Sequence, residues 1–363
     1  MIDVKSFTPE ELGVADENAK NSEGLKYYNF KSEPFRIYGL CDAQNPDRHY
    51  CIRMPENVSE TVSQGVKNLN FCTAGGRVRF VTTSPYLAIK MDRKPMEQAS
   101  NFSPIGRAGM DVYIKRCDAA GQIFWTTIAP AVDCSGIDKF VKLPAGEKHI
   151  TLNMPNYAGV TELYIGLDEN STLTRHPDYT YEKPVFYYGS SITQGGCPSR
   201  PGMSYENIIS RRLDANYINF GFSGNAKAED TIVDYMAEQD FSVFVCDYDH
   251  NAPNVEHLKN THEKLYLKIR EKHPDVPVIF VTKPDFWLKW GECEHRRDVI
   301  YNTYINAKNR RENVIFIDGY SLFAGQNRED CTVDGCHPND LGMFRMAEVI
   351  GKAVEYALRD LNV

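Results

Sequence analysis

Residues 185–194 form the stretch Val185-Phe186-Tyr187-Tyr188-Gly189-Ser190-Ser191-Ile192-Thr193-Gln194. Its run of apolar and aromatic residues is typical of a short strand buried on both faces of a parallel sheet. The glycine and serines that follow are typical of a tight turn, and serine is favoured at the start of a helix. This pattern predicts a buried strand that ends in a turn and presents a serine.

The rest of this half alternates between short apolar runs and longer amphipathic segments. Strands are predicted at 185–188, 217–220, 242–246, 276–281 and 314–317, and helices at 204–213, 229–237, 255–272, 296–309 and 340–358. This alternation predicts βαβ units on a parallel sheet.

The first half has a different pattern, with short mixed polar and apolar stretches separated by turn residues. They lie at 77–83, 86–91, 109–114, 123–128 and 148–153. Many short strands at this spacing favour an antiparallel β-sandwich. The polar stretch 175–184 contains two prolines and predicts a linker. We therefore expect a β-sandwich domain over residues 1–178 and an α/β domain over residues 179–363.

Composition excludes several classes of protein. The chain has 363 residues and a formal net charge of −8, whereas nucleic-acid binding needs clustered Lys and Arg. No apolar run is long enough to cross a membrane, and the first residues lack a basic segment followed by an apolar one. We therefore expect no nucleic-acid or membrane partner and a cytoplasmic location, although a mature secreted chain would look the same.

The ten cysteines are expected to be reduced thiols that pack as small hydrophobic residues. A zinc site that uses residues of the cluster Cys293, His295, Cys331, Cys336 and His337 is the alternative. The chain contains no Cys-x-x-Cys pair, and the spacing does not match a structural zinc site. We therefore predict no metal site.

Polar segments follow the predicted strands, at 189–196, 221–225 and 247–252, and another lies at 334–339 before the last helix. In open α/β sheets, functional sites lie outside the carboxyl ends of the strands, so these segments are expected to converge. Ser191 needs an adjacent base to act as a nucleophile, and His337 can be that base. Asp334 can orient the imidazole, while Ser191 N–H, Gly224 N–H and the Asn251 amide can stabilise an oxyanion.

These segments resemble the blocks of the SGNH (GDSL-type) hydrolase superfamily, which are a Gly-Asp-Ser block, a Gly block, an Asn block and a late Asp-x-x-His block. Ser191 matches the nucleophile, with Ser190 in place of the usual aspartate. Gly224 matches the oxyanion glycine, and Asp334 and His337 match the acid and the base in spacing and order.

Other candidate residues are assigned with alternatives. The Asn block departs from the usual Gly-x-Asn-Asp, so Asn251 is assigned to it, but a shift of one residue would place His250 there. Arg200, in the loop after the nucleophile turn, either contacts substrate or forms a surface ion pair. Trp287 and Trp290 follow the fourth predicted strand, and either stack on a sugar or anchor their loop.

In the first half, Gly109-Met110-Asp111-Val112-Tyr113 is similar to the GxDLY signature of a β-rich domain that precedes some SGNH catalytic domains. Val112 stands where that signature has leucine. The resemblance covers about residues 30 to 358. It implies a three-layer α/β/α, flavodoxin-like parallel sheet preceded by a jelly-roll-like β-sandwich.

The resemblance also implies a serine esterase that works through an acyl-enzyme, with no metal or organic cofactor. Relatives of this architecture include carbohydrate O-acetylesterases, so the expected partner is a small-molecule or oligosaccharide ester, preferably an acetyl ester. The altered Ser190 and Asn blocks keep an impaired carbohydrate-binding or scaffold protein open as an alternative. An acyltransferase, a simple aryl or alkyl esterase, and a homo-oligomer also stay open.

Overall fold

The computed structural model describes residues 4–94, 100–116, 121–284 and 292–360. The chain forms two compact units. The first contains Met1–Arg53, Phe71–Asp178 and Ser199–Gly202, and the second contains Met54–Asn70, Tyr179–Pro198 and Met203–Val363. No helix within the described ranges is both long enough and apolar enough to cross a membrane.

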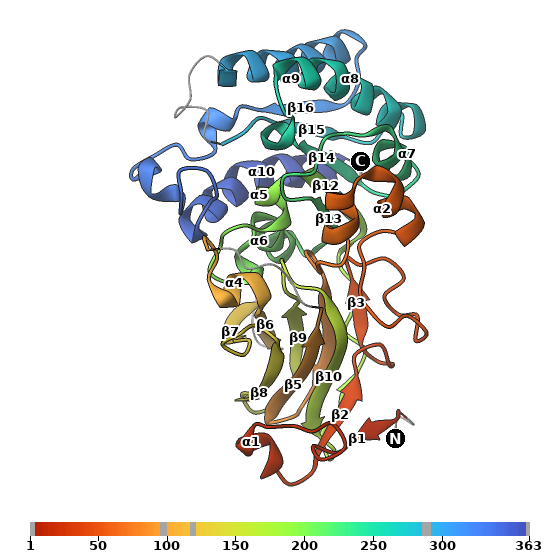
Figure 1. The fold of residues 1–363 in the computed structure, drawn as a ribbon, viewed down its shortest axis with the longest axis vertical. Coiled ribbons are helices and arrows are strands. Elements are labelled where there is room, and N and C mark those ends of the chain that lie inside the picture. The colour runs from red at the N-terminus through yellow and green to blue at the C-terminus, as the bar shows by residue number, and fades with distance from the viewer. Residues whose placement is uncertain (1–3, 95–99, 117–120, 285–291, 361–363) are drawn as a thin grey trace. The chain divides into compact units, whose positions relative to one another are not determined.

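The first unit is built mainly of strands (Figure 1). They are β1 (Ser6–Phe7), β2 (Leu25–Asn29), β3 (Arg36–Tyr38), β4 (Arg77–Thr82), β5 (Tyr86–Arg93), β6 (Met110–Arg116), β7 (Ile123–Ile128), β8 (Gly136–Lys142), β9 (Lys148–Asn153), β10 (Val160–Asp168) and β11 (Leu173–Thr174). Its short helices are α1 (Glu17–Lys20) and α4 (Pro104–Ala108).

These strands form two antiparallel sheets, with the orders β1-β2-β10-β5-β8 and β11-β4-β9-β6-β7, and β3 pairs with β4. Buried side chains from both sheets share one hydrophobic core, for example Phe80 on β4 and Ile165 on β10. On β5 and β6, for example, every second side chain points into this core, as the period of a strand requires. The structure thus confirms the predicted β-sandwich.

The second unit alternates between strands and helices (Figure 1). Its strands are β12 (Tyr181–Gly189), β13 (Ala215–Gly221), β14 (Val243–Asp247), β15 (Val278–Val281) and β16 (Val314–Ile317). Its helices are α2 (Glu56–Val62), α3 (Gln64–Leu69), α5 (Ser191–Gln194), α6 (Tyr205–Leu213), α7 (Asp230–Ala237), α8 (Val255–Lys272), α9 (Glu292–Asn309) and α10 (Asp340–Asp360).

All pairs in this sheet are parallel, and the strand order is β13-β12-β14-β15-β16. Relative to the first strand, β12, this is the flavodoxin-like order 2-1-3-4-5, so the predicted α/β fold is confirmed. Val185 and Tyr187 pack in the core formed with α5, α6 and α10, whereas Phe186 and Tyr188 pack in the core formed with α7, α8 and α9. Helices therefore cover both faces of the sheet (Figure 1).

Strand β12 begins at Tyr181, inside the polar stretch that was expected to be a linker. Tyr181 already pairs with Ala215, and the register then shifts before Val185. Pro184 lies in this irregular part of the strand, and proline has no N–H group to donate to a neighbouring strand. The proline therefore marks a break in the pairing and not the end of the linker.

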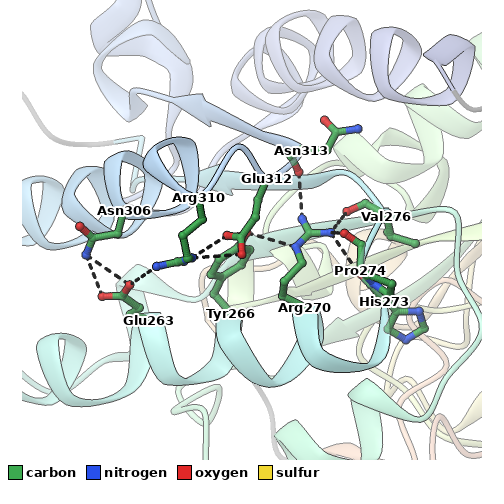
Figure 2. Close-up of polar contacts among 10 residues, drawn as sticks. All are labelled: Glu263, Tyr266, Arg270, His273, Pro274, Val276, Asn306, Arg310, Glu312 and Asn313. Atoms are coloured by element: carbon green, nitrogen blue, oxygen red, sulfur yellow. Dashed lines mark hydrogen bonds and ion pairs between the residues drawn. The ribbon is translucent and has the colours of Figure 1, made fainter.

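Arg270 closes the carboxyl end of α8 (Figure 2). Its Nη1 donates to the carbonyl oxygens of His273, Pro274 and Val276, at 2.9, 2.7 and 2.8 Å. Its Nη2 donates to the carbonyl oxygen of Asn313, at 3.0 Å. These carbonyls precede β15 and β16, so Arg270 fixes the amino ends of two strands, at the sheet edge opposite the carboxyl ends.

We expect Arg270→Met to lower the free energy of unfolding by about 2–3 kcal/mol, because four carbonyls lose a charged donor. Urea unfolding measures the change. The control is Arg310→Met, which removes an exposed ion pair with Glu263 and Glu312 (Figure 2) and is expected to change stability by less than about 1 kcal/mol. Equal effects of the two substitutions would contradict this role of Arg270.

Candidate active site

A tight turn joins the end of β12, at Gly189, to α5, which begins at Ser191. Ser190 caps this helix, because its Oγ accepts a hydrogen bond from Ile192 N–H at 3.2 Å. Serine is as good an N-cap as aspartate, so the departure at position 190 preserves the cap. Ser191 is the first residue of the helix, and the residue is 8% exposed, so it is largely enclosed yet reachable.

Gly189 allows the helix to pack directly on the end of β12. A Cβ atom at this position would lie 2.1 Å from Thr193 Oγ1 and 2.5 Å from the carbonyl oxygen of Asp247. No real side chain tolerates such distances, so only glycine brings α5 this close to the strands. The fixed position of Ser191 follows from this close packing.

Ser191, His337 and Asp334 lie together in the structure, as the sequence predicts. Ser191 Oγ lies 2.9 Å from His337 Nε2, although the two residues are 146 positions apart in the chain. His337 Nδ1 lies 2.7 Å from Asp334 Oδ2. The other oxygen, Asp334 Oδ1, accepts hydrogen bonds from the backbone N–H groups of Cys336 and His337, at 3.0 and 2.8 Å. The carboxylate therefore fixes both the turn and the plane of the imidazole.

The turn after β13 carries Gly224, whose φ is +68°, a region that glycine adopts without strain. Phe222 N–H donates to the carbonyl oxygen of Gly189 at 2.9 Å, and Ser223 N–H donates to Gln194 Oε1 at 2.9 Å. These bonds hold the turn against the end of β12 and against α5. The structure thus brings Gly224 to the same sheet edge as Ser191.

Asn251 and His250 face different parts of the site. Asn251 Oδ1 accepts a hydrogen bond from Ala226 N–H at 3.2 Å, so its amide is tied to the segment that follows Gly224. An amide anchored through its oxygen keeps its NH₂ group for donation. His250 Nδ1 instead lies 3.9 Å from Cys336 Sγ, beside the histidine turn.

Sequence reasoning missed Asp247, which ends β14 and is 2% exposed. Its Oδ2 accepts hydrogen bonds from Thr193 Oγ1 and Tyr205 OH, at 3.1 and 3.3 Å. Burial raises the pKa of Asp247 to about 7, although the charge of His250 and both hydrogen bonds lower it. The only signal in the sequence was an acidic residue at the end of a buried strand.

The raised pKa of Asp247 predicts how stability depends on pH. The unfolded carboxyl titrates near pH 4, so its stabilising contribution is complete below about pH 4 and is lost as pH rises toward 7. Asp247→Asn removes this titration. We therefore expect the stability of the variant relative to wild type to rise by about 1.4 kcal/mol per pH unit across this range. Urea unfolding at several pH values tests this, and a constant difference would contradict it.

Arg200 lies among the signature residues of the first unit. Its guanidinium lies 4.0 Å from the ring centroid of Phe124, and its Nη2 donates to Tyr113 OH at 3.4 Å. Its Nε lies 3.7 Å from the buried carboxylate of Asp111, which also accepts from Gly202 N–H at 2.7 Å. Arg200 therefore forms an ion pair, but with a buried carboxylate and not at the surface as predicted. Its contact with substrate stays a prediction.

The remaining candidates are two tryptophans and a possible metal site. Trp287 and Trp290 lie outside the described residues. Within the described ranges, no group of three or more His, Cys, Asp or Glu side chains is arranged to hold a metal ion.

Comparisons with known proteins identify families that match most of the chain. Residues 182–355 match the GDSL-like Lipase/Acylhydrolase family, and residues 25–173 match the GxDLY domain, the N-terminus of SGNH-hydrolase-type esterases. A search of curated proteins found no significant match.

Several solved structures are similar over nearly their whole length. A GDSL-like lipase from Bacteroides ovatus ATCC 8483 is 26% identical, with a TM-score of 0.82 over 92% of this chain and 98% of that chain. The salicylyl-acyltransferase SsfX3 of a tetracycline biosynthetic pathway is 17% identical, with a TM-score of 0.74 over 94% and 99%. The acetyl xylan esterase Est2A of Butyrivibrio proteoclasticus is 14% identical, with a TM-score of 0.52 over 92% and 98%. The chain therefore belongs to the SGNH (GDSL-type) hydrolases, as a carboxylic ester hydrolase with an N-terminal GxDLY β domain.

Proposed function

We propose that this esterase removes short acyl groups, with acetyl esters of carbohydrates as the preferred substrates, through an acyl-enzyme on Ser191. The hydrogen bond of 2.9 Å between Ser191 Oγ and His337 Nε2 carries this proposal. His337 donates Nδ1–H to Asp334, which leaves the Nε2 lone pair to accept the serine proton.

In the first half-reaction, Ser191 Oγ bonds to the ester carbonyl carbon as its proton moves to His337 Nε2. The tetrahedral intermediate collapses when the bond to the leaving oxygen breaks, and His337 gives its proton to that oxygen. The alcohol leaves, and the acyl group stays on Ser191. Water then attacks the acyl-enzyme by the same steps and releases the carboxylic acid and the free serine.

The developing oxyanion needs donors that are in place before the reaction. The proposed donors are Ser191 N–H at the start of α5, Gly224 N–H in the turn after β13, and Asn251 Nδ2 after β14. Each comes from a different strand end, and Gly189 is in register with both Gly221 and Asp247. Parallel pairing thus supports the convergence of the three donors on one carbonyl oxygen.

The substrate class rests on fold neighbours and not on a residue of the site. Est2A is an acetyl xylan esterase, and a family two carbohydrate esterase from Cellvibrio japonicus has the same fold, with a TM-score of 0.59. These relatives support an acetylated sugar as the ester to test first.

The test compares acetylated oligosaccharides with p-nitrophenyl acetate and with longer aryl esters, and measures acid release. We expect acetate release from the oligosaccharides with the highest kcat/KM, and stoichiometric labelling of Ser191 by a fluorophosphonate. Turnover of aryl esters alone would overturn the carbohydrate assignment. Acetyl transfer to an added sugar in preference to water would indicate an acyltransferase, and the absence of both turnover and label would indicate a binding protein.

A further inference from the structure

The turn that carries Asn251 is held by an arginine from a distant helix. Arg296, on α9, donates from Nη1 to the carbonyl oxygen of Asp249 at 2.8 Å and to Asp249 Oδ1 at 3.2 Å. Its Nη2 donates to the carbonyl oxygen of Ala252 at 2.8 Å. The two carbonyls lie on either side of Asn251 in the chain, so one guanidinium fixes both ends of this turn.

This contact is buried and compensated in charge. Arg296 is 5% exposed and Asp249 is 1% exposed. The second oxygen of the carboxylate, Asp249 Oδ2, accepts from Lys283 N–H at 3.1 Å, just after β15. Arg296 Nε donates to Glu292 at 2.8 Å. Each polar group of the pair thus points to a specific partner, and the turn is tied to both α9 and β15.

A guanidinium presents several N–H groups in a rigid plane, which suits three acceptors at fixed positions. A lysine ammonium keeps the charge but is a point donor on a flexible stem, so it cannot hold two separated carbonyls in the same way. The geometry of the turn therefore depends on the shape of the Arg296 side chain and not only on its charge.

We propose that Arg296 is a positioning residue for the oxyanion hole, and that it holds the Asp249–Ala252 turn so that Asn251 meets the transition state. This inference rests on the proposed function, because it acts through Asn251. Arg296 binds the turn through Asp249 and Ala252, and the proposal includes no contact between Arg296 and substrate. An oxyanion donor acts mainly in the transition state, so a loosened turn should lower kcat and leave KM nearly unchanged.

A double-mutant cycle tests the proposal. We expect Arg296→Lys to lower kcat by about 10- to 100-fold, with KM changed by less than about threefold. In the Asn251→Ala background the same substitution should lower kcat by less than about twofold, because the donor that it positions is already gone. Losses that multiply in the double variant, or a kcat of Arg296→Lys within about twofold of wild type, would overturn the proposal.

Arg297→Lys is the matched control on the same helix. Arg297 forms a partly exposed ion pair with Asp318, which follows β16, at 2.8 Å, and we expect Arg297→Lys to keep kcat within about twofold of wild type. Should Arg296→Lys fail to fold, as judged by its melting curve, Asp249→Asn takes its place in the cycle, since it weakens the same contact from the other side.

Failure of the proposed function gives a different result. A wild-type protein with no ester turnover and no fluorophosphonate label on Ser191 would remove both proposals. An active, labelled wild type with multiplicative losses in the cycle would remove only the role of Arg296.

Discussion

Replacing Ser191 by alanine is expected to lower kcat for ester hydrolysis by about three orders of magnitude or more. In the proposed mechanism the hydroxyl oxygen forms the acyl-enzyme, and without it water would have to attack the ester directly. His337 and the oxyanion donors remain, so a residual rate above the uncatalysed one is expected. The same variant should lose labelling by a fluorophosphonate, measured by intact mass.

The control for this variant is Ser199→Ala, at an exposed serine of the loop that follows. It should keep both the label and a wild-type rate. The melting temperature of Ser191→Ala should stay close to that of wild type, since the substitution removes only a hydroxyl, whose Oγ lies 2.9 Å from Nε2 of the partly exposed His337 side chain. A near-normal rate in the folded Ser191→Ala protein would remove the assignment of the nucleophile.

The α/β unit was the easier part to predict, because its signals are local. The predicted helix 255–272 coincides with α8, whose start is fixed by Asn254 Oδ1 accepting from His257 N–H at 2.8 Å. Its strands are buried on both faces and appear as apolar runs. The cap and the period of such elements lie within a few residues, so they can be read from the sequence alone.

The sequence predicts the β-sandwich and five of its strands, which lie close to β4, β5, β6, β7 and β9, but it does not predict the others. Strand β8, for example, has the mixed sequence Gly136-Ile137-Asp138-Lys139-Phe140-Val141-Lys142 and pairs with β5, about 50 residues earlier. Strand β10 was also missed, and it pairs with both β2 and β5. Such strands are stabilised by cross-strand contacts that are distant in the chain, which a local pattern does not contain.

The position of helices α2 and α3 in the second unit also could not be predicted from local sequence patterns. They lie within the first hundred residues, yet Val66 of α3 packs in the core of the second unit with Phe220. A hydrogen bond joins the two ends of this segment, since Asn70 Oδ1 accepts from Met54 N–H at 2.9 Å. The sequence gives no sign that this segment leaves the β-sandwich, because only tertiary contacts decide it.

Some residues of the candidate site could be predicted from the sequence, and others could not. Ser191, Asp334 and His337 could be found because each lies in a short motif in a fixed order. Arg296 could not, because it acts on Asp249, 47 positions earlier, and no local pattern links an arginine within a helix to a turn after a strand. The buried hydrogen bonds of Asp247 could not be predicted for the same reason, since its partners lie on α5 and α6.

Asn251→Ala is expected to lower kcat by about 10²- to 10³-fold with little change in KM, because a donor to the oxyanion works in the transition state. The rates are measured with p-nitrophenyl acetate, whose release of p-nitrophenolate is followed directly by absorbance. His250→Ala should have a much smaller effect, since His250 faces Cys336. An intact rate in Asn251→Ala with a large loss in His250→Ala would move the role by one residue.

The variant Asn251→Asp distinguishes two roles of Asn251: donating a hydrogen bond to the oxyanion, and fixing the turn through Ala226 N–H. Aspartate keeps an oxygen that can accept from Ala226 N–H, so the contact of 3.2 Å that fixes the side chain can still form. It has no N–H group to offer, and its charge would repel the oxyanion. If Asn251 only anchored the turn, aspartate would restore the rate lost with alanine. If it donates to the transition state, aspartate should be at least as slow as alanine, and that ordering of rates is what we expect.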